Sequence, residues 1–175
     1  YGGNDSNGDD KNPAGMVYEA IKLAKQQNPS LNFKNYDWNN DGEVDQVYLI
    51  YAGYGESSDE DGSLANTIWP HEWQLSAANY KLSYDGVTID TYGCSPELLG
   101  NESYPVQMDG IGTACHEFSH CLGLPDLYDT SGSSNSAFGM DAWSLMDYGC
   151  YSDDGYKPTG YTSYERWMSG WLTPK

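Results

Sequence analysis

The residues best suited to chemistry lie in the run His116-Glu117-Phe118-Ser119-His120. Two histidines at positions i and i+4 share one face of a helix, so both imidazoles can bind the same Zn²⁺ ion. Glu117, one step round the helix, is then placed to take a proton from a water molecule that the zinc polarises. The chain has three histidines, and because two of them fall in this pattern, a surface helix with idle histidines explains it poorly. The spacing predicts a catalytic zinc site.

The residues after the second histidine predict a third ligand. Gly123 can adopt a positive φ angle, which ends the helix and reverses the chain. The reversal would bring Asp126 back toward the two histidines, where its carboxylate completes a set of three zinc ligands. His71 is the remaining histidine, and a structural hydrogen-bonding role suits it better than zinc binding because Asp126 already completes the spacing.

The extended pattern HExxHxxGxx(H/D) resembles the zinc motif of the metzincin clan of zinc endopeptidases. The runs HEFSHCLGLPDLYD, WSLMDYG and GWLTP, with DWNNDGEVDQVYLIYAG and IWPHEW upstream, look most like the M6 peptidases, the immune inhibitor A group of secreted bacterial metalloproteases. The resemblance covers most of the chain. It implies that His116, His120 and Asp126 bind zinc, that Glu117 is the general base, and that Met146 lies beneath the metal as the clan's methionine turn.

The same resemblance makes Tyr148 a candidate catalytic residue. In some metzincins, a tyrosine two residues after the methionine approaches the zinc or donates a hydrogen bond to the tetrahedral intermediate. A phenol near the metal could stabilise the developing oxyanion. Because the chain has 16 tyrosines, a role in the hydrophobic core is the alternative.

A second group of possible metal ligands lies between Asp37 and Asp45. Oxygen-bearing side chains occupy positions 1, 3, 5 and 9 of this segment, with glycine at position 6, as in the first half of an EF-hand loop. Position 12 is Tyr48 rather than glutamate, so the EF-hand is incomplete. We predict a structural Ca²⁺ site there, and residues 5–9 repeat the pattern more weakly. The alternative is an Asx-rich turn whose side chains cap their own backbone. The predicted calcium ligands are Asp37, Asn39, Asp41, Glu43 and Asp45.

Composition excludes several classes of protein. With 8 Lys+Arg against 26 Asp+Glu and a net charge of −18, the chain lacks the clustered cations that nucleic-acid binding needs. It has no run of 18 apolar residues, so no transmembrane segment is expected. An aromatic content of 14% is too high for a disordered acidic chain. Four cysteines without a CxxC spacing argue against a thiolate zinc site, and few lysines with many tyrosines and tryptophans suit an exported protein.

Periodicity places the motifs on a small set of elements. Asn12-Pro13 predicts the start of an amphipathic helix over 13–27, and the apolar run 44–51 predicts a buried strand. Asp85-Gly86 predicts a hairpin turn between runs 80–84 and 87–92. Helical spacing over 109–123 carries the zinc ligands, and a short helix closes the chain within 161–171.

The resemblance and these elements together indicate a single α/β domain over residues 1–175, a metzincin-like catalytic domain. We expect a twisted mixed sheet with the zinc helix in an upper lobe (about 1–123), and a loop-rich lower lobe (about 124–175) with the methionine turn. The expected function is that of a secreted zinc endopeptidase acting on proteins or peptides, with a removed propeptide and possible flanking domains.

Three alternatives stay open. One is a catalytically inactive metal-binding module, which retention of Glu117 argues against. Another is a calcium-stabilised adhesion or carbohydrate-binding domain, suggested by the acidic loops. The third is a zinc hydrolase that acts on non-peptide amides.

Overall fold

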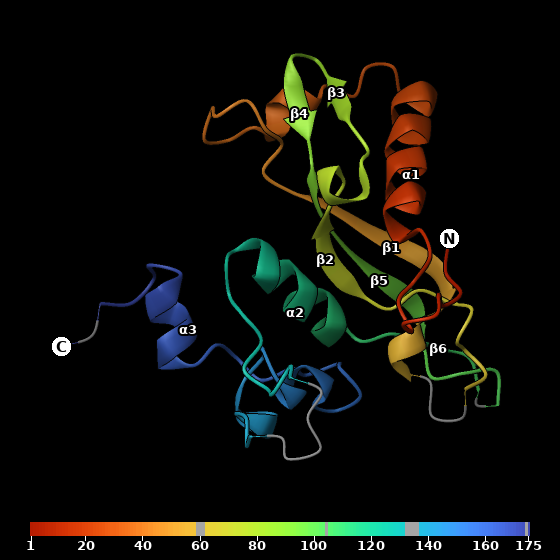
Figure 1. Cartoon of the computed structure of the whole chain (residues 1–175). Coiled ribbons are helices and arrows are strands. Elements are labelled where there is room, and N and C mark those ends of the chain that lie inside the picture. Colours follow the sequence, from red (N-terminus) through yellow and green to blue (C-terminus); the bar gives the residue numbers. More distant parts are fainter. Residues whose placement is uncertain (59–61, 104, 132–136, 174) are drawn as a thin grey trace. The chain divides into compact units, whose positions relative to one another are not determined.

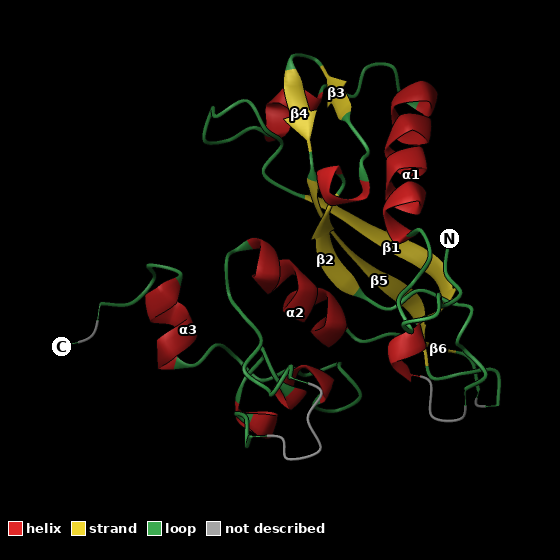
Figure 2. Cartoon of the chain, viewed as in Figure 1, coloured by secondary structure: helices red, strands yellow, loops and turns green. Residues whose placement is uncertain are grey.

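The computed structural model describes residues 1–58, 62–103, 105–131, 137–173 and 175. Figures 1 and 2 show the order of its elements along the chain. They are α1 (Pro13–Gln27), β1 (Val47–Tyr54), β2 (His71–Gln74), β3 (Leu82–Tyr84), β4 (Val87–Ile89), β5 (Thr91–Leu99), β6 (Gln107–Met108), α2 (Ile111–Cys121) and α3 (Ser163–Met168). None of the helices in the described part of the chain is long and apolar enough to cross a membrane.

The chain divides into two compact units, Tyr1–Val106 and Gln107–Lys175. Helix α2, which carries two of the predicted zinc ligands, therefore groups with the residues that follow it, whereas we expected it to close the preceding lobe near residue 123. The reason lies in its first turn, which packs against a later loop: the amide of Gly112 donates a hydrogen bond to the carbonyl of Gly155 (2.9 Å). A Cβ atom on Gly112 would lie only 1.8 Å from the carbonyl oxygen of Cys150, so glycine permits this close approach.

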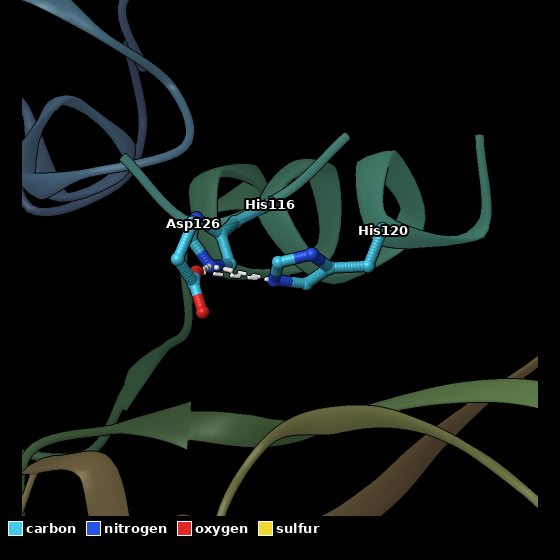
Figure 3. Close-up of side chains that lie close together, drawn as sticks. All are labelled: His116, His120 and Asp126. Atoms are coloured by element: carbon cyan, nitrogen blue, oxygen red, sulfur yellow. Dashed lines mark hydrogen bonds and ion pairs between the residues drawn. The ribbon is translucent and has the colours of Figure 1, made fainter. Parts of the chain in front are cut away.

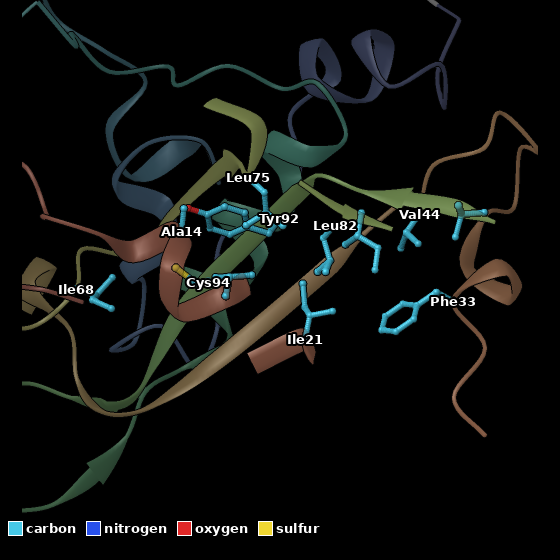
Figure 4. Packing of buried hydrophobic residues seen from close by; sticks show 12 residues of the cluster. Ala14, Ile21, Phe33, Val44, Ile68, Leu75, Leu82, Tyr92 and Cys94 are labelled. Carbon is cyan, nitrogen blue, oxygen red and sulfur yellow. The ribbon is translucent and has the colours of Figure 1, made fainter. Parts of the chain in front are cut away.

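Helix α1 begins and ends as predicted. The Asn12 side chain caps it by accepting a hydrogen bond from the amide of Gly15 (3.1 Å), and Pro13 occupies the first helical position. Its buried face carries Ala14, Val17 and Ile21, which belong to the hydrophobic core of the first unit (Figure 4). The sheet contributes Tyr92 and Cys94 to the same core.

The main sheet of the first unit is mixed, as predicted, with strand order β1-β5-β2. Strands β1 and β5 are parallel, with Leu49 opposite Cys94, whereas β2 runs antiparallel to β5. Strand β1 begins at Val47 rather than at Val44, because the amide of Val44 donates to the carbonyl of Thr88 instead (2.9 Å). Neither β2 nor most of β5 was expected from the sequence, because β2 is short and polar and β5 contains glycine, serine and proline.

The hairpin β3–β4 confirms the turn predicted at Asp85-Gly86. Both residues have positive φ angles, 55° and 85°, as a type I′ turn requires. Asp85 also accepts hydrogen bonds from the amide of Phe33 (2.9 Å) and from Lys25. The turn is therefore tied to the end of α1 and to the segment after it.

The second unit consists of β6, α2, α3 and loops with short 3₁₀ turns (Figure 2). Helix α3 is shorter than the expected span 161–171. Thr162 starts it through a capping box with Glu165, and Gly170, with a φ angle of 74°, follows its C-terminal end.

Candidate metal centre

Helix α2 brings the two predicted histidine ligands together. His116 and His120 are four residues apart, and their rings meet edge to face with centroids 4.8 Å apart. Their Nε2 atoms lie 3.2 Å from each other (Figure 3). The helical spacing thus produces the convergence that the sequence predicted.

The chain reversal after α2 supplies the third group. Gly123 adopts the predicted positive φ angle of 86°, and the amide of Leu124 donates to the carbonyl of Ser119 (3.1 Å), which closes the turn. The Oδ1 atom of Asp126 then lies 3.2 Å from Nε2 of His116 and 3.2 Å from Nε2 of His120. Within the described residues, these three form the one cluster of His, Cys, Asp or Glu side chains that could hold a metal ion.

The geometry of the three atoms fits a zinc ion. They form a triangle whose three sides are each 3.2 Å. A tetrahedral zinc ion with bonds of about 2.0–2.1 Å holds its ligand atoms about 3.3–3.4 Å apart. Oδ1 of Asp126 is also buried and receives no hydrogen bond from the described residues, as expected of an atom that binds a cation.

The other nitrogen of each imidazole is held by a backbone carbonyl. Nδ1 of His116 lies 2.9 Å from the carbonyl of Leu145, and Nδ1 of His120 lies 2.8 Å from the carbonyl of Leu124. A carbonyl accepts but cannot donate, so each Nδ1 carries a proton, and whenever the ring is neutral its Nε2 lone pair points toward Asp126. Two lone pairs and a carboxylate oxygen meeting without a donor between them require a cation.

The pKa values of His116, His120 and Asp126 are shifted in the directions that favour positive charge on the histidines and negative charge on the aspartate. Burial lowers the pKa of His116, but Asp126, the Cys150 thiol and the Leu145 carbonyl outweigh burial and raise it to about 10. Burial also lowers the pKa of His120, but Asp126 and a backbone carbonyl together outweigh burial and raise this pKa. Burial raises the pKa of Asp126, but the two histidines outweigh it and hold this pKa well below its usual range. In the metal-free protein, protons supply the charge that a metal ion would bring.

The predicted base and methionine adjoin this cluster. Glu117 is buried on α2 next to His116 in the sequence, and its charge acts on His116 and on Tyr128. Met146 is fully buried, and its carbonyl accepts a hydrogen bond from the amide of Leu127 (2.8 Å), directly after Asp126. The Leu145–Met146 segment therefore contacts both the zinc helix and the returning chain.

Two tyrosines differ in their contact with the cluster. Tyr148 is 64% exposed and rests edge-on against Tyr151, with ring centroids 5.4 Å apart. Tyr128 instead lies against the site: burial and then the charge of Asp126 and a hydrogen bond to that carboxylate raise its pKa to about 12. Sequence reasoning missed Tyr128, although its place two residues after Asp126 was a usable signal.

His71 takes the structural role that was predicted. Its Nδ1 lies 2.7 Å from the carbonyl of Trp69, and its Nε2 lies 2.9 Å from the hydroxyl of Tyr92. Burial lowers the pKa of His71, so the ring is held neutral within the first unit.

The acidic loop at Asp37–Asp45 adopts the alternative geometry. The Asp37 carboxylate accepts hydrogen bonds from the amides of Asp41 (3.1 Å) and Gly42 (3.3 Å). Asp45 accepts from the amide of Trp38. In this loop the side chains cap their own backbone, as in an Asx-rich turn, and no three described carboxylates converge on one point. The structure thus does not support the predicted calcium site.

An HExxH helix and a returning carboxylate thus form one candidate metal site, of the kind that metallopeptidases carry. A model of the immune inhibitor A peptidase M6 catalytic domain matches residues 1–174, and the chain belongs to this family.

Two curated relatives match the chain over part of their own length. Immune inhibitor A of Bacillus thuringiensis subsp. alesti is 27% identical over 179 residues, which cover 93% of this chain and 26% of the relative. The pre-pro-metalloprotease PrtV of Vibrio cholerae serotype O1 (strain M66-2) is 28% identical in an alignment over 185 residues. This alignment covers 95% of this chain and 20% of the relative. The chain therefore spans about a fifth to a quarter of the length of these curated relatives.

Proposed function

We propose that this chain is the catalytic domain of an exported, zinc-dependent endopeptidase with a metzincin-like active site. The observation that supports the proposal most directly is the triangle of His116, His120 and Asp126, with sides of 3.2 Å. Its size suits zinc, and its atoms are acceptors that only a cation can satisfy. The metalloprotease name of the Vibrio relative and the peptidase family to which the chain belongs support peptide bonds as the substrate.

Each residue of the site has a distinct task. His116, His120 and Asp126 would hold the zinc ion, which when bound supplies a Lewis acid and lowers the pKa of water. Glu117 would take a proton from the attacking water and return it to the leaving amine. The Leu145 and Leu124 carbonyls hold the proton at Nδ1 of each imidazole, so both Nε2 lone pairs stay available.

Two further assignments belong to this proposal. Met146 is the methionine of the Met-turn, supported by its full burial and its contact with the residue after Asp126. A phenol stabilises the developing oxyanion: Tyr148 is the candidate from sequence, and Tyr128 is the tyrosine whose hydroxyl contacts the site.

The export and processing of the protein are proposed from its relatives. The name of the Vibrio relative marks it as a pre-pro-protein, and both relatives are several times longer than the matched region. We infer that this domain is likewise accompanied by a removed propeptide and by flanking domains.

The test is to measure metal content and peptide cleavage on the same purified protein. We expect about one zinc ion per chain, cleavage of quenched peptide substrates, loss of cleavage with a chelator and recovery with added zinc. Zinc without cleavage would favour an inactive binding module. Calcium without zinc would favour an adhesion or carbohydrate-binding domain, and hydrolysis confined to non-peptide amides would contradict the choice of substrate.

A further inference from the structure

The carboxylate of Glu165 is fully buried in the second unit. The side chain lies in the first turn of α3 and is 0% exposed. Within the described residues, no lysine or arginine forms an ion pair with it. Burying a carboxylate away from cations is costly unless hydrogen bonds replace its water, so the identity of its donors indicates what it stabilises.

Neutral donors from two segments surround Glu165. Its Oε1 atom accepts hydrogen bonds from the hydroxyl of Ser144 (2.7 Å) and from the amide of Met146 (3.4 Å). The amide of Met146 also donates to the Ser144 hydroxyl (3.0 Å). The other oxygen, Oε2, accepts from the amide of Thr162 at the start of α3. One carboxylate thus joins α3 to the turn formed by residues 144–146.

The turn at residues 144–146 also contacts His116, one of the predicted zinc ligands. Between Ser144 and Met146 lies Leu145, whose carbonyl is 2.9 Å from Nδ1 of His116. A carbonyl can direct an imidazole only if its own peptide plane is held in place. The amide of that Leu145–Met146 peptide is the group that donates to Ser144 and Glu165.

We propose that Glu165 is a positioning residue for the zinc site. By binding the Ser144 hydroxyl and the Met146 amide, it orients the Leu145 carbonyl, which keeps the proton on Nδ1 of His116 and aims Nε2 at the metal. This inference rests on the proposed function, because it assigns Glu165 a part in holding the zinc ion.

The test compares zinc affinity with fold stability in matched variants. Glu165→Ala removes every carboxylate contact, and the loss of an outer-shell partner typically weakens metal binding by about 10–100-fold. Glu165→Gln keeps one acceptor oxygen, which the two donors at Ser144 and Met146 would claim, so it should retain most of the affinity. Thr162→Ala removes the helix cap and leaves the carboxylate in place, so it should lower the melting temperature of the metal-free protein without changing zinc affinity.

Three measurements are needed: the zinc Kd by competition with a chromogenic chelator, the visible spectrum of the Co²⁺-substituted protein, and the melting temperature of the metal-free protein. Of Glu165→Ala, Glu165→Gln and Thr162→Ala, we expect weak zinc binding and an altered Co²⁺ spectrum only in Glu165→Ala. If Glu165→Ala does not fold, Ser144→Ala and Glu165→Gln decide, because Ser144→Ala should weaken zinc binding while Glu165→Gln should not.

Two results would overturn the inference. One is a zinc Kd and a Co²⁺ spectrum that match those of the wild type in both Glu165→Ala and Ser144→Ala. The other is an equal loss of affinity in Thr162→Ala, since the effect would then follow helix stability. Failure of the proposed function is separable, because in that case the wild-type protein itself would bind no zinc.

Discussion

At the residue scale, the proposal assigns metal binding and proton transfer to different side chains. Glu117→Ala removes the proposed base and none of the three ligands, so zinc content should stay near one per chain. Peptide hydrolysis should fall by about 10²–10⁴-fold or more, the usual worth of general acid–base catalysis. Zinc analysis by mass spectrometry alongside a peptide cleavage assay measures both quantities.

The control for this prediction is Glu102→Ala, which removes an exposed glutamate and should change neither quantity. Asp126→Ala should behave in the opposite way to Glu117→Ala, losing zinc first and activity as a consequence, with partial recovery in excess zinc. If His71 were the third ligand, His71→Ala would lose zinc and Asp126→Ala would keep it. Substantial hydrolysis by Glu117→Ala would refute the proposed mechanism.

Two tyrosines can be assigned roles by comparing their phenylalanine variants. Tyr128→Phe removes a hydrogen bond to a zinc ligand, so zinc affinity should fall by about tenfold, at the low end for outer-shell partners. Tyr148→Phe changes an exposed phenol, so its zinc affinity should match the wild type while kcat falls if it stabilises the oxyanion. Equal zinc affinities in the two variants would show that the contact of Tyr128 with Asp126 does not contribute to zinc binding.

At the scale of elements, the reversal after α2 determines whether Asp126 reaches the histidines. Gly123 has a φ angle of 86°, and a left-handed conformation costs a residue with a Cβ atom about 1–2 kcal/mol. Gly123→Ala should therefore lower stability and also weaken zinc binding, because relaxing the turn moves Asp126. Thermal denaturation and a zinc titration measure the two effects.

Gly42 offers a matched control for that substitution. Its φ angle is 92°, and a Cβ atom added at either glycine would meet no described residue within 4 Å, so the backbone strain is comparable. Gly42→Ala should destabilise the protein to a similar extent while leaving zinc affinity unchanged. Equal zinc affinities in the two variants would mean that the turn tolerates alanine without moving the carboxylate.

At the scale of the whole molecule, metal binding should raise stability through zinc rather than through calcium. A ligand that binds the native state alone stabilises it by RT ln(1 + [L]/Kd), about 2.7 kcal/mol at a hundredfold excess over Kd. Added zinc should therefore raise the melting temperature of the metal-free protein, and this rise should vanish in Asp126→Ala.

Calcium should have a smaller effect, because Asp37 and Asp45 already accept backbone hydrogen bonds. The comparison of wild type with Asp41→Ala in a calcium titration checks this. A calcium-dependent rise in melting temperature that Asp41→Ala abolishes would restore the calcium site that the loop's spacing predicted.

The cluster of His116, His120 and Asp126 and several elements could be predicted because the information is local. Two histidines four apart, a glycine that reverses the chain and an aspartate three residues later all lie within 11 residues, where helix and turn geometry set the positions. The capped helix α1 and the Asp85-Gly86 hairpin are encoded by neighbouring residues in the same way.

Contacts between distant segments were decided by the tertiary structure alone. Nothing in the spacing of the motif indicates that the Leu145 carbonyl binds His116, that Glu165 is buried against Ser144, or that β2 and β5 pair through His71 and Cys94. The physical reason is that periodicity reports which face of an element is apolar, whereas hydrogen bonds across 20 or more residues depend on which segments pack together. The ligand types and their order thus follow from the sequence, and the groups that orient them follow from the fold.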